Sequence, residues 1–477
     1  MNAQIIKLFA FITVCFAVLV GFTSYWAVLD ADDLKNERVN KRPLFEAQQI
    51  KRGTITTADG DVIAVSKSEG RGASRQFVRQ YPTGTLFGHP IGFSYITQGN
   101  SAFEAFHNSE LIGDDSEFTS IIDEIKGEKQ VGHDIITSLD TTAQQTAVDL
   151  LAGRPGAVVA IEPSTGAIKA LVSEPSFDPN QIPETDGELA DQFAAATQGQ
   201  YPPGSTFKLV TAAAALDSGK IDADTTINSP GTIDVQGNPL ANSDGSDYGD
   251  INVEQALTNS VNTFFAQLGE DVGTDTLYEY MDRFGFNAKP QIDLPADELS
   301  VSGVFDFETE EFFGPDDPVD IGRIAIGQER LLATPLQMAE VGATIANGGK
   351  LMKPQIWSEV KDVDGRTIKS MDPDEQSDVM SEDSAAQLTE AMKAVVNEGT
   401  GTAAALSGID VAGKTGTAEV PEREACEGLP NQAWFVGFAP ADDPQIAVAA
   451  TVECTDGQGG TVAAPIAAGV MQDLIGE

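Results

Sequence analysis

The sequence predicts an α+β protein whose largest domain is an antiparallel sheet packed with helices. Strand-like apolar stretches lie at both ends of the segment 141–477, at 156–173 and at 409–454. Ala-rich helical stretches fill the residues between them, and TVAAPIAAGVMQDLI predicts a closing helix at 461–475. Strands from the two ends are therefore expected to meet in one sheet that the helices cover.

The first element is an apolar stretch long enough to cross a membrane. Residues 8–29 carry no charge, and at about 1.5 Å per residue such a helix spans a hydrocarbon core of about 30 Å. A cleaved signal peptide is the alternative. Its apolar region is usually about 7 to 15 residues and ends at a small-residue cleavage site, and no convincing site of that kind follows this stretch. The sequence predicts a transmembrane anchor.

Charges on either side of the anchor predict its orientation. Lys7 and the terminal amine precede the span, and Asp30, Asp32 and Asp33 follow it. Positive flanks stay in the cytoplasm, so residues 1–7 are expected to be a cytoplasmic tail. We expect a single-pass protein of the cell membrane with the bulk of the chain outside.

Residues 30–140 are expected to form a juxtamembrane stalk and a small non-catalytic α+β module. Residues 30–49 are charged and Gln-rich, and KRGTITTADGDVIAVS at 51–66 predicts two short strands around an Ala-Asp-Gly turn. A helical stretch, FTSIIDEI, begins at Phe118. The pattern changes near residue 141, where TTAQQTAVDLLAG predicts an amphipathic helix that opens the domain 141–477.

The charge of the chain excludes one class of partner. Acidic residues number 73 and basic residues 29, which gives a net charge of −44. Such a chain is repelled by nucleic acid phosphates, so no nucleic acid partner is expected. The acidity is typical of a solvated surface, on which charges more than roughly 8 to 10 Å apart are largely screened. It is also compatible with a salt-adapted host.

The chain contains three cysteines. Cys15 lies in the anchor. Cys426 and Cys454 flank the strand-like stretches NQAWFVGFAP and QIAVAATVEC, which as an antiparallel hairpin would bring the two residues close. A disulfide in an oxidising exterior and two free thiols both fit this pattern. No histidine lies nearby, so no metal site is expected, and no cofactor is expected either.

Two helices of the main domain can be placed. From Thr206, TFKLVTAAAALD is apolar on nearly every side, which predicts a helix buried in the middle of the domain and ending at Ser218. The stretch TPLQMAEVGATIANGG predicts a second helix, with Thr334 as its cap, Pro335 in the first turn and Gln337 completing a capping box.

The stretch YPPGSTFKLV at 201–210 places Ser205 at the N-terminus of the buried helix, where N–H groups and the helix dipole favour developing negative charge. Positions three apart share a helix face, so Lys208 can reach the Ser205 hydroxyl and activate it as a nucleophile. A simple N-cap serine is the alternative. Ser358 and Lys361 repeat the spacing, but in a predicted strand, where residues three apart point to opposite faces.

Two further motifs each occur once. Ser260-Val261-Asn262 forms a short polar break between two predicted helices, although a structural turn would have the same appearance. Lys414-Thr415-Gly416 lies in VAGKTGTAEV, followed by Thr417. Glycine is unfavourable in a strand unless something approaches the backbone closely, and both Gly413 and Gly416 occur here.

The positions of the three histidines limit which residue type could act as the base for a serine nucleophile. His89, His107 and His133 all precede the strand pair at 156–173. A Ser-His-Asp triad within the domain that carries Ser205 is therefore excluded, and lysine is left as the base.

In order and spacing, these motifs resemble those of the penicillin-recognising serine acyltransferases. The stretches RGTI at 52, GAVVAIEPSTGAIKALVSEPSFDPN at 156, AIGQERLLATPLQMA at 325 and AWFVGFAP at 433 are similar to class B penicillin-binding proteins. YPTGTLFGHPIGF at 81 and NSELIG at 108 are similar to the actinobacterial penicillin-binding protein A group. The resemblance covers about residues 50–475. It implies that 141–477 is a penicillin-binding transpeptidase domain.

The resemblance implies a D,D-transpeptidase that cross-links peptidoglycan stem peptides through an acyl-enzyme on Ser205 and is a target of β-lactams. Lys208 would be the general base, Ser260 would relay the proton to the leaving amine, and Asn262 would bind a substrate amide. A basic Lys208 needs its pKa lowered by roughly 3 units from about 10.4, which burial and the charge of Lys414 could supply.

The substrate's terminal carboxylate would be held by Lys414, Thr415 and Thr417, with Gly416 between the two threonines. The oxyanion hole would be formed by the N–H groups of Ser205 and Thr417. An amine on a neighbouring stem peptide would then accept the acyl group.

Three other functions share part of this pattern. A β-lactamase would need a water-activating residue, and neither the anchor nor the 50–140 module is expected in one. A D,D-carboxypeptidase would transfer the acyl group to water. A membrane-tethered β-lactam sensor or idle scaffold is disfavoured because the short tail leaves no visible signalling domain.

No glycan-polymerising domain fits between the anchor and residue 150. The resemblance therefore implies an integral membrane glycan polymerase as a partner, with the 30–150 module as its docking surface.

Overall fold

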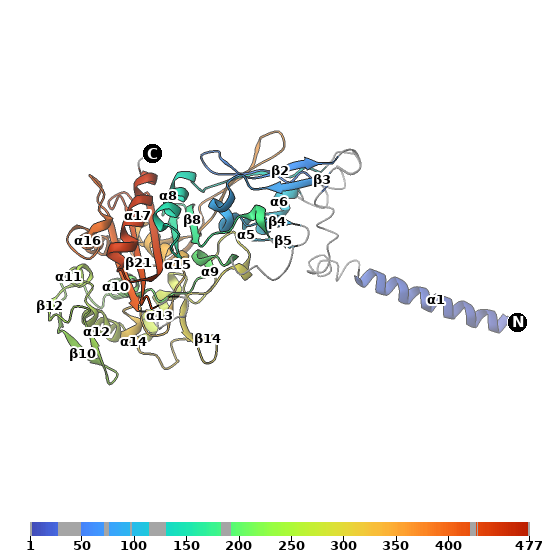
Figure 1. Cartoon of the computed structure of the whole chain (residues 1–477). Helices are drawn as coiled ribbons and strands as arrows, with labels where there is room; N and C mark the ends of the chain where they lie inside the picture. Colours follow the sequence, from blue (N-terminus) through green and yellow to red (C-terminus); the bar gives the residue numbers. More distant parts are fainter. Residues whose placement is uncertain are drawn as a thin grey trace.

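The computed structural model describes residues 2–26, 49–70, 76–95, 98–113, 130–182, 192–419, 426 and 428–475. Its first element is the helix α1 (Asn2–Ser24) (Figure 1). Within the described residues, Gln4–Ser24 is the one segment long and apolar enough to cross a membrane, with a mean hydropathy of 2.6. The helix begins at Asn2, so residues 2–7, expected to be a tail, continue it. Lys7 can extend its amine toward the membrane surface from within such a helix.

A five-stranded antiparallel sheet forms the centre of the main domain, in the order β20-β21-β22-β7-β8. Its strands come from both ends of the segment 141–477, as predicted. They are β7 (Gly156–Ile161), β8 (Ile168–Glu174), β20 (Ala412–Glu419), β21 (Asn431–Ala439) and β22 (Ile446–Thr455).

Both faces of this sheet are buried, because successive side chains of a strand point to opposite faces. Val158 and Ala160 of β7 pack in one apolar cluster with α8 (Thr141–Leu151) and α17 (Gly459–Ile475). Val159, also on β7, packs in the other cluster with α15 (Pro335–Ala346). The result is a layer of helices on each side of the sheet, the α+β architecture that the sequence predicts.

A helical part of the domain carries the buried helix predicted from Thr206. Lys208 to Leu216 of this helix, α10 (Lys208–Asp217), are all buried. A 3₁₀ turn, η6 (Gly204–Phe207), precedes it and contains Ser205. The neighbouring helices are α9 (Ala195–Gln198), α11 (Val253–Thr258), α12 (Asn262–Val272), α13 (Thr274–Arg283), α14 (Ile321–Ile324) and α16 (Glu382–Asn397).

Short strands complete this part of the domain. They are β9 (Ile227–Ser229), β10 (Thr232–Val235), β11 (Asn238–Ala241), β12 (Gly249–Ile251), β13 (Gly303–Asp306), β14 (Glu311–Phe312), β15 (Leu331–Leu332), β16 (Lys350–Met352) and β19 (Glu375–Asp378).

The helix α15 is capped differently from the prediction. Thr334 accepts the N–H of Gln337, as expected for its cap. The Gln337 side chain does not return to Thr334, because the Thr334 N–H already donates to the Ser302 hydroxyl. Gln337 instead donates to the carbonyl oxygen of Phe284, which lies beyond α13. The predicted capping box is therefore wrong, and the Gln337 side chain instead links α15 to the end of α13.

The N-terminal module contains a second sheet, in the order β18-β17-β6-β1-β2-β3. The two strands predicted around the Ala-Asp-Gly turn are β1 (Ile55–Thr56) and β2 (Val62–Glu69). The other members are β3 (Gln76–Gln80), β6 (Asp134–Thr137), β17 (Trp357–Lys361) and β18 (Thr367–Ser370). The hairpin β17–β18 thus pairs with the module, although its residues lie inside the segment 141–477. The helix expected from Phe118 falls outside the described residues.

Short helices and strands cover the remainder of this module. They are η3 (Gly84–Phe87), α4 (Gly88–Ile91), β4 (Ser94–Tyr95), β5 (Gly99–Asn100), α5 (Ala102–Phe106) and α6 (Asn108–Ile112). In Figure 1 the module, in blue, and the part around α12, in green, lie on opposite sides of the main sheet.

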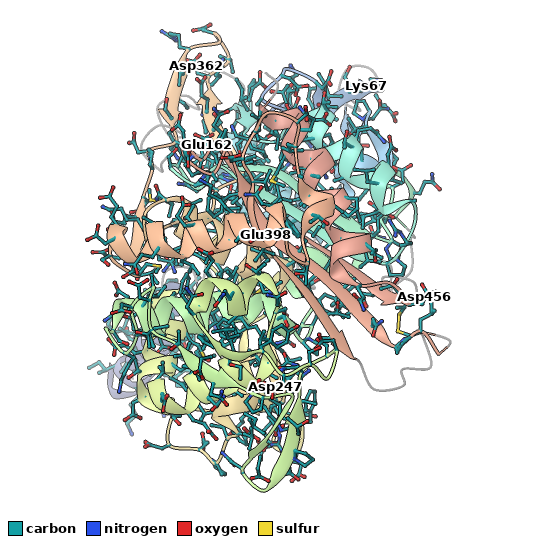
Figure 2. All side chains as sticks on the ribbon, turned by 90° about the vertical axis from the view of Figure 1, so that its left-hand side faces the viewer. Lys67, Glu162, Asp247, Asp362, Glu398 and Asp456 are labelled. Atoms are coloured by element: carbon teal, nitrogen blue, oxygen red, sulfur yellow. A yellow bond between two sulfur atoms is a disulfide. The ribbon has the colours of Figure 1, made fainter. Side chains whose placement is uncertain are left out.

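The acidic charge is spread over the whole surface. Figure 2 labels Asp247, Glu398 and Asp456 on well-separated parts of the chain. All three are exposed. Exposed acidic residues on separate parts of the chain are typical of a solvated surface.

A buried ion cluster holds the N-terminal module together. The Glu104 carboxylate, fully buried, accepts from Arg52 Nε at 2.6 Å and from Arg79 Nε at 2.6 Å. Burial alone would raise the pKa of Glu104, but the two guanidinium groups outweigh it and hold the pKa below its usual value. The carboxylate thus compensates two buried cations.

We expect Glu104→Gln to destabilise the module by about 3 to 5 kcal/mol, because two buried guanidinium groups lose their counter-charge. Hydrogen exchange at the amides of β2 and β3 measures this local stability. The control is Arg366→Ala, which removes an exposed ion pair with Asp362 and should leave exchange unchanged. Equal protection in Glu104→Gln and the native chain would show that the cluster does not stabilise the module.

Candidate active site

The three predicted motifs meet at one cavity of ≈ 540 Å³. Ser205 from η6, Ser260 and Asn262 from the corner between α11 and α12, and residues of β20 all line it. The members that the motifs contribute are Ser205, Ser260, Asn262, Thr415 and Thr417. The cavity size is that of a small-ligand site.

Two hydrogen bonds and a close backbone contact fix the turn that carries Ser205. Gly204 N–H donates to Gly327 O at 2.9 Å, and Trp434 Nε1 donates to Pro202 O at 3.0 Å. A Cβ on Gly327 would lie 1.9 Å from Gly204 O, so only glycine allows this approach. None of these contacts is predicted by the sequence patterns.

Ser205 is not a helix cap. The residue before η6 is Pro203 and the residue before α10 is Phe207, and neither cap uses a serine side chain. Ser205 is half-buried, and within the described residues its hydroxyl makes no hydrogen bond. The hydroxyl therefore lines the cavity with its proton and lone pairs available.

Lys208 is fully buried and bonded to the corner that carries Ser260. Its Nζ lies 2.8 Å from Ser260 O, 2.8 Å from Asn262 Oδ1 and 3.3 Å from Ser260 Oγ. A neutral amine has two N–H bonds, and the two carbonyl oxygens can accept both, which leaves the lone pair for a hydroxyl proton. Within the described residues Lys208 has no hydrogen bond to Ser205, since the acceptors at 260–262 hold its amine.

Lys414, on β20, also bonds the hydroxyl of Ser260. Its Nζ donates to Ser260 Oγ at 3.0 Å and to Thr415 O at 3.0 Å. Burial lowers the pKa of Lys414 to about 7. Burial, and then the charge of Lys414, hold the pKa of Lys208 well below its usual value. Both amines that bond the Ser260 hydroxyl therefore lose their proton more easily than an exposed lysine does.

Ser260 itself adopts an unusual backbone conformation. Its φ is +54°, in the left-handed region that non-glycine residues rarely adopt. Asn262 holds the corner in place, since its Nδ2 donates to Ala241 O at 3.0 Å while its Oδ1 faces Lys208. Strain of this kind collects at functional sites, where neighbouring contacts maintain it.

The glycines of the third motif allow close approach, as predicted. A Cβ on Gly416 would lie 2.8 Å from Pro203 O, so β20 can lie directly beside the turn of Ser205. A Cβ on Gly413 would lie 2.3 Å from the Phe435 ring. Thr417 lies beside the same turn, and its Oγ1 accepts from Gly459 N–H at 3.1 Å.

The structure also places Thr400 in the cavity, a residue that the sequence reasoning missed. Its Oγ1 lies 2.6 Å from Thr415 Oγ1. If Thr415 donates its proton to a ligand in the cavity, its oxygen is free to accept the proton of Thr400. No sequence signal near Thr400 indicates this contact, because it comes from the loop after α16.

We expect Thr400→Val to slow acylation by a β-lactam roughly tenfold, because the Thr415 hydroxyl loses the partner that orients it. Thr400→Ser keeps that partner and should react at the native rate. The second-order acylation rate constant measures both variants. A serine variant as slow as the valine variant would assign Thr400 a packing role.

The remaining predicted residues lie away from the cavity. The structure joins Cys426 and Cys454 in a disulfide, with their Cα atoms 4.9 Å apart. Ser358 lies on β17 in the sheet of the N-terminal module, so the repeated Ser-x-x-Lys spacing belongs to a strand.

The fold and the cavity together define a serine acyltransferase of the penicillin-binding class. Residues 156–472 match the family described as penicillin binding protein transpeptidase domain, and residues 52–135 match the penicillin binding protein A dimerisation domain. The chain belongs to the penicillin-binding protein transpeptidase family.

Within this family the chain is of the penicillin-binding protein A type. It is 34% identical to the peptidoglycan D,D-transpeptidase PbpA of Mycolicibacterium smegmatis, over 98% of this chain and 97% of that protein. The crystal structure of PBPA from Mycobacterium tuberculosis is similar with a TM-score of 0.77 at 32% identity, covering 90% of this chain and 100% of that one. A penicillin G acyl-enzyme complex of that protein has a TM-score of 0.77 at 32% identity, with coverages of 89% and 100%. The family predicted from the motifs is confirmed.

Proposed function

We propose that the chain is a D,D-transpeptidase that cross-links peptidoglycan stem peptides through an acyl-enzyme on Ser205. One observation carries the proposal: both buried lysines bond the Ser260 hydroxyl at the cavity that Ser205 lines. Ser205 would be the nucleophile, and the two amines of lowered pKa, joined through the Ser260 hydroxyl, would form the proton relay. The names of the relatives and the penicillin G complex support the same reaction.

In the acylation step Ser205 Oγ bonds to the carbonyl carbon of the penultimate D-Ala, and the C–N bond to the terminal D-Ala breaks. Lys208 accepts the Ser205 proton on its lone pair. Ser260, within reach of both amines, passes a proton to the leaving nitrogen. In the second step an amine of a neighbouring stem attacks the ester, loses a proton by the reverse path and frees Ser205.

The substrate carboxylate and amide would bind to the walls of the cavity. We assign the terminal carboxylate to Lys414, Thr415 and Thr417, and a substrate backbone amide to Asn262. The N–H groups of Ser205 and Thr417 would bind the oxyanion, each donor contributing on the order of 10² to 10³ in rate. β-Lactams would enter the same cavity and acylate the same oxygen.

We expect incubation with a stem peptide ending in D-Ala-D-Ala, together with an amine acceptor, to release D-Ala and form the cross-linked amide. Mass spectrometry of the products measures both. Release of D-Ala with a free carboxyl product, at the same rate with or without the amine, would contradict transpeptidation and indicate a D,D-carboxypeptidase.

Three further assignments belong to this proposal. The short N-terminal end lies in the cytoplasm and the catalytic domain outside, in agreement with the flanking charges. The residues 30–140 form a stalk and a non-catalytic module, and 141–477 form the catalytic domain. An integral membrane glycan polymerase supplies the strands and docks on the module, a protein-binding role that fits the dimerisation-domain match.

A further inference from the structure

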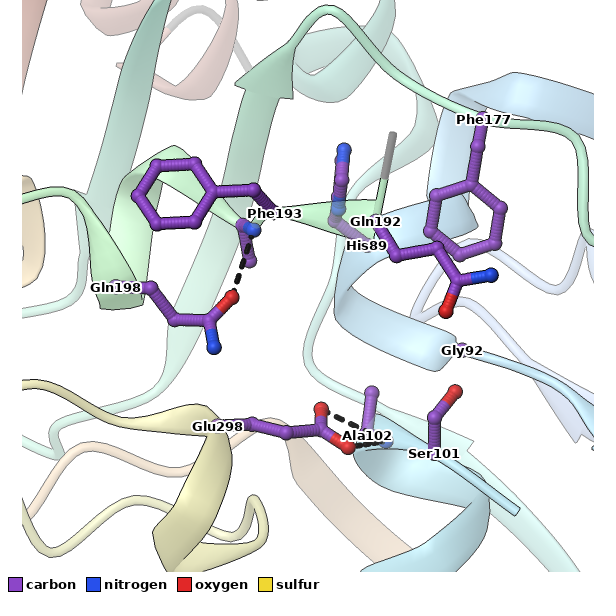
Figure 3. A pocket seen from close by; sticks show the side chains of 10 residues that line it. His89, Gly92, Ser101, Ala102, Phe177, Gln192, Phe193, Gln198 and Glu298 are labelled. Carbon is purple, nitrogen blue, oxygen red and sulfur yellow. Dashed lines mark hydrogen bonds between the residues drawn. The ribbon is translucent and has the colours of Figure 1, made fainter. Parts of the chain in front are cut away.

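A second cavity, of ≈ 390 Å³, lies where the N-terminal module meets the catalytic domain (Figure 3). The module contributes Ser101 and Ala102 to its wall, and the catalytic domain contributes Phe177, Phe193, Gln198 and Glu298. None of these residues has a part in the acyl transfer proposed above. The cavity is large enough for a small ligand.

The carboxylate of Glu298 is the charged group of this cavity. Both of its oxygens lie 3.0 Å from the Ala102 N–H, and Figure 3 shows the carboxylate turned to that residue. Within the described residues no lysine or arginine forms an ion pair with Glu298. Burial raises the pKa of Glu298, and this outweighs the hydrogen bond from Ala102, which lowers it; the charge of Asp297 raises the pKa further.

The rest of the wall adds aromatic surface and no positive charge. Phe177 and Phe193 both line the cavity, and 53% of Phe193 is exposed. His89 Nε2 lies 3.1 Å from Pro175 O, and burial lowers the pKa of its imidazole, so the ring is neutral at neutral pH. An uncompensated carboxylate beside aromatic rings attracts an organic cation through charge and through cation–π contact.

Gln198 offers a donor for a second ligand group. Its Oε1 accepts the Ala194 N–H at 2.9 Å, which leaves the amide nitrogen without a partner among the described residues. Figure 3 shows this side chain on the same side of the cavity as Glu298. An amide carbonyl of a ligand could accept from it.

We infer that this cavity is a second binding site, which takes a small lysine-like ligand with a primary ammonium group, an alkyl stem and an amide. The ammonium binds Glu298, the stem lies against the aromatic part of the wall and the amide accepts from Gln198. The site is independent of the acyl transfer at Ser205.

The test measures binding of Nα-acetyl-lysine N-methylamide to the full chain in detergent micelles by titration calorimetry. The matched ligand Nα-acetyl-norleucine N-methylamide has a similar stem without the ammonium. We expect a Kd on the order of 1 mM for the lysine compound, as suits a ligand of its size. We expect at least about tenfold weaker binding of the norleucine compound.

Glu298→Gln keeps an acceptor for the Ala102 N–H and removes the charge. This variant should weaken the binding of the lysine compound at least about tenfold. The control Glu308→Gln neutralises an exposed carboxylate on the β13–β14 turn and should leave the Kd unchanged. Comparing the two variants also separates binding at Glu298 from a general attraction of the cationic ligand to the acidic surface. Native affinity in Glu298→Gln, equal binding of the two compounds, or no saturable binding would overturn the inference.

Protein acylated by penicillin separates this site from the catalytic one. We expect the acylated protein and the Ser205→Ala variant both to bind the lysine compound with the Kd of the native protein. Loss of binding on acylation would place the ligand in the catalytic cavity and overturn the second site. Native binding by a chain that penicillin does not label would leave the second site intact and contradict only the acyl transfer.

Discussion

Ser205→Ala is expected to take up no radioactive or fluorescent penicillin. Ser205 lines the cavity three residues before Lys208, and no other serine that the structure places in this cavity has a lysine three positions later. Loss of the oxygen removes the atom to which the acyl group bonds. Labelling followed on a denaturing gel measures the result.

The matched control is Ser358→Ala, which removes the other serine with a lysine three positions later. Ser358 lies on β17 of the N-terminal sheet, so this variant should label fully. The Ser205 hydroxyl makes no hydrogen bond within the described residues, so Ser205→Ala should keep the native melting temperature. Label that persists in Ser205→Ala would place the nucleophile at another residue.

The three motifs that meet at the cavity could be predicted because each depends on local spacing. Ser205 and Lys208 are three apart, Ser260 and Asn262 two apart, and the third motif is one continuous stretch. A turn leading into a helix, a corner and a strand each place one set, and apolar periodicity predicts the helices and the strand. The same periodicity predicted the strands of the main sheet, whereas their order β20-β21-β22-β7-β8 comes from the structure.

Contacts between distant segments could not be predicted in this way. Thr400 reaches Thr415 from the loop after α16, and Trp434 holds Pro202 from the middle of β21. The hairpin β17–β18 joins the N-terminal sheet because the strand β6 presents an edge to it. Each of these contacts is set by how the elements pack, and no single stretch of sequence contains it.

Lys208→Met should reduce the acylation rate constant by roughly 10² to 10⁴, because general base catalysis contributes about that much. Methionine has a similar length and keeps the apolar packing of a buried stem. Stopped-flow measurement with a chromogenic β-lactam gives the rate constant. A circular dichroism spectrum equal to that of the native protein would show that the variant is folded, so that the lower rate constant comes from the missing base. A loss of less than about tenfold would contradict the role of Lys208 as the base.

The pH dependence of the same rate tests how the two lysines interact. A base acts when neutral, so the rate falls as pH drops through the pKa of Lys208. The charge of Lys414 lowers that pKa, and the pKa of Lys414 itself is about 7. The charge that Lys414 gains on acidification therefore opposes a second charge on Lys208 and keeps Lys208 neutral to a lower pH.

Lys414→Met removes this charge and should raise the pKa of Lys208, so the acid limb of the rate profile should move to higher pH. The rate at the plateau should also fall, because the substrate carboxylate loses a partner. Rate constants measured between about pH 5 and 9 separate the two effects, since one moves the limb and the other lowers the plateau. A plateau that falls without any movement of the limb would mean that Lys414 binds the carboxylate but does not tune the base.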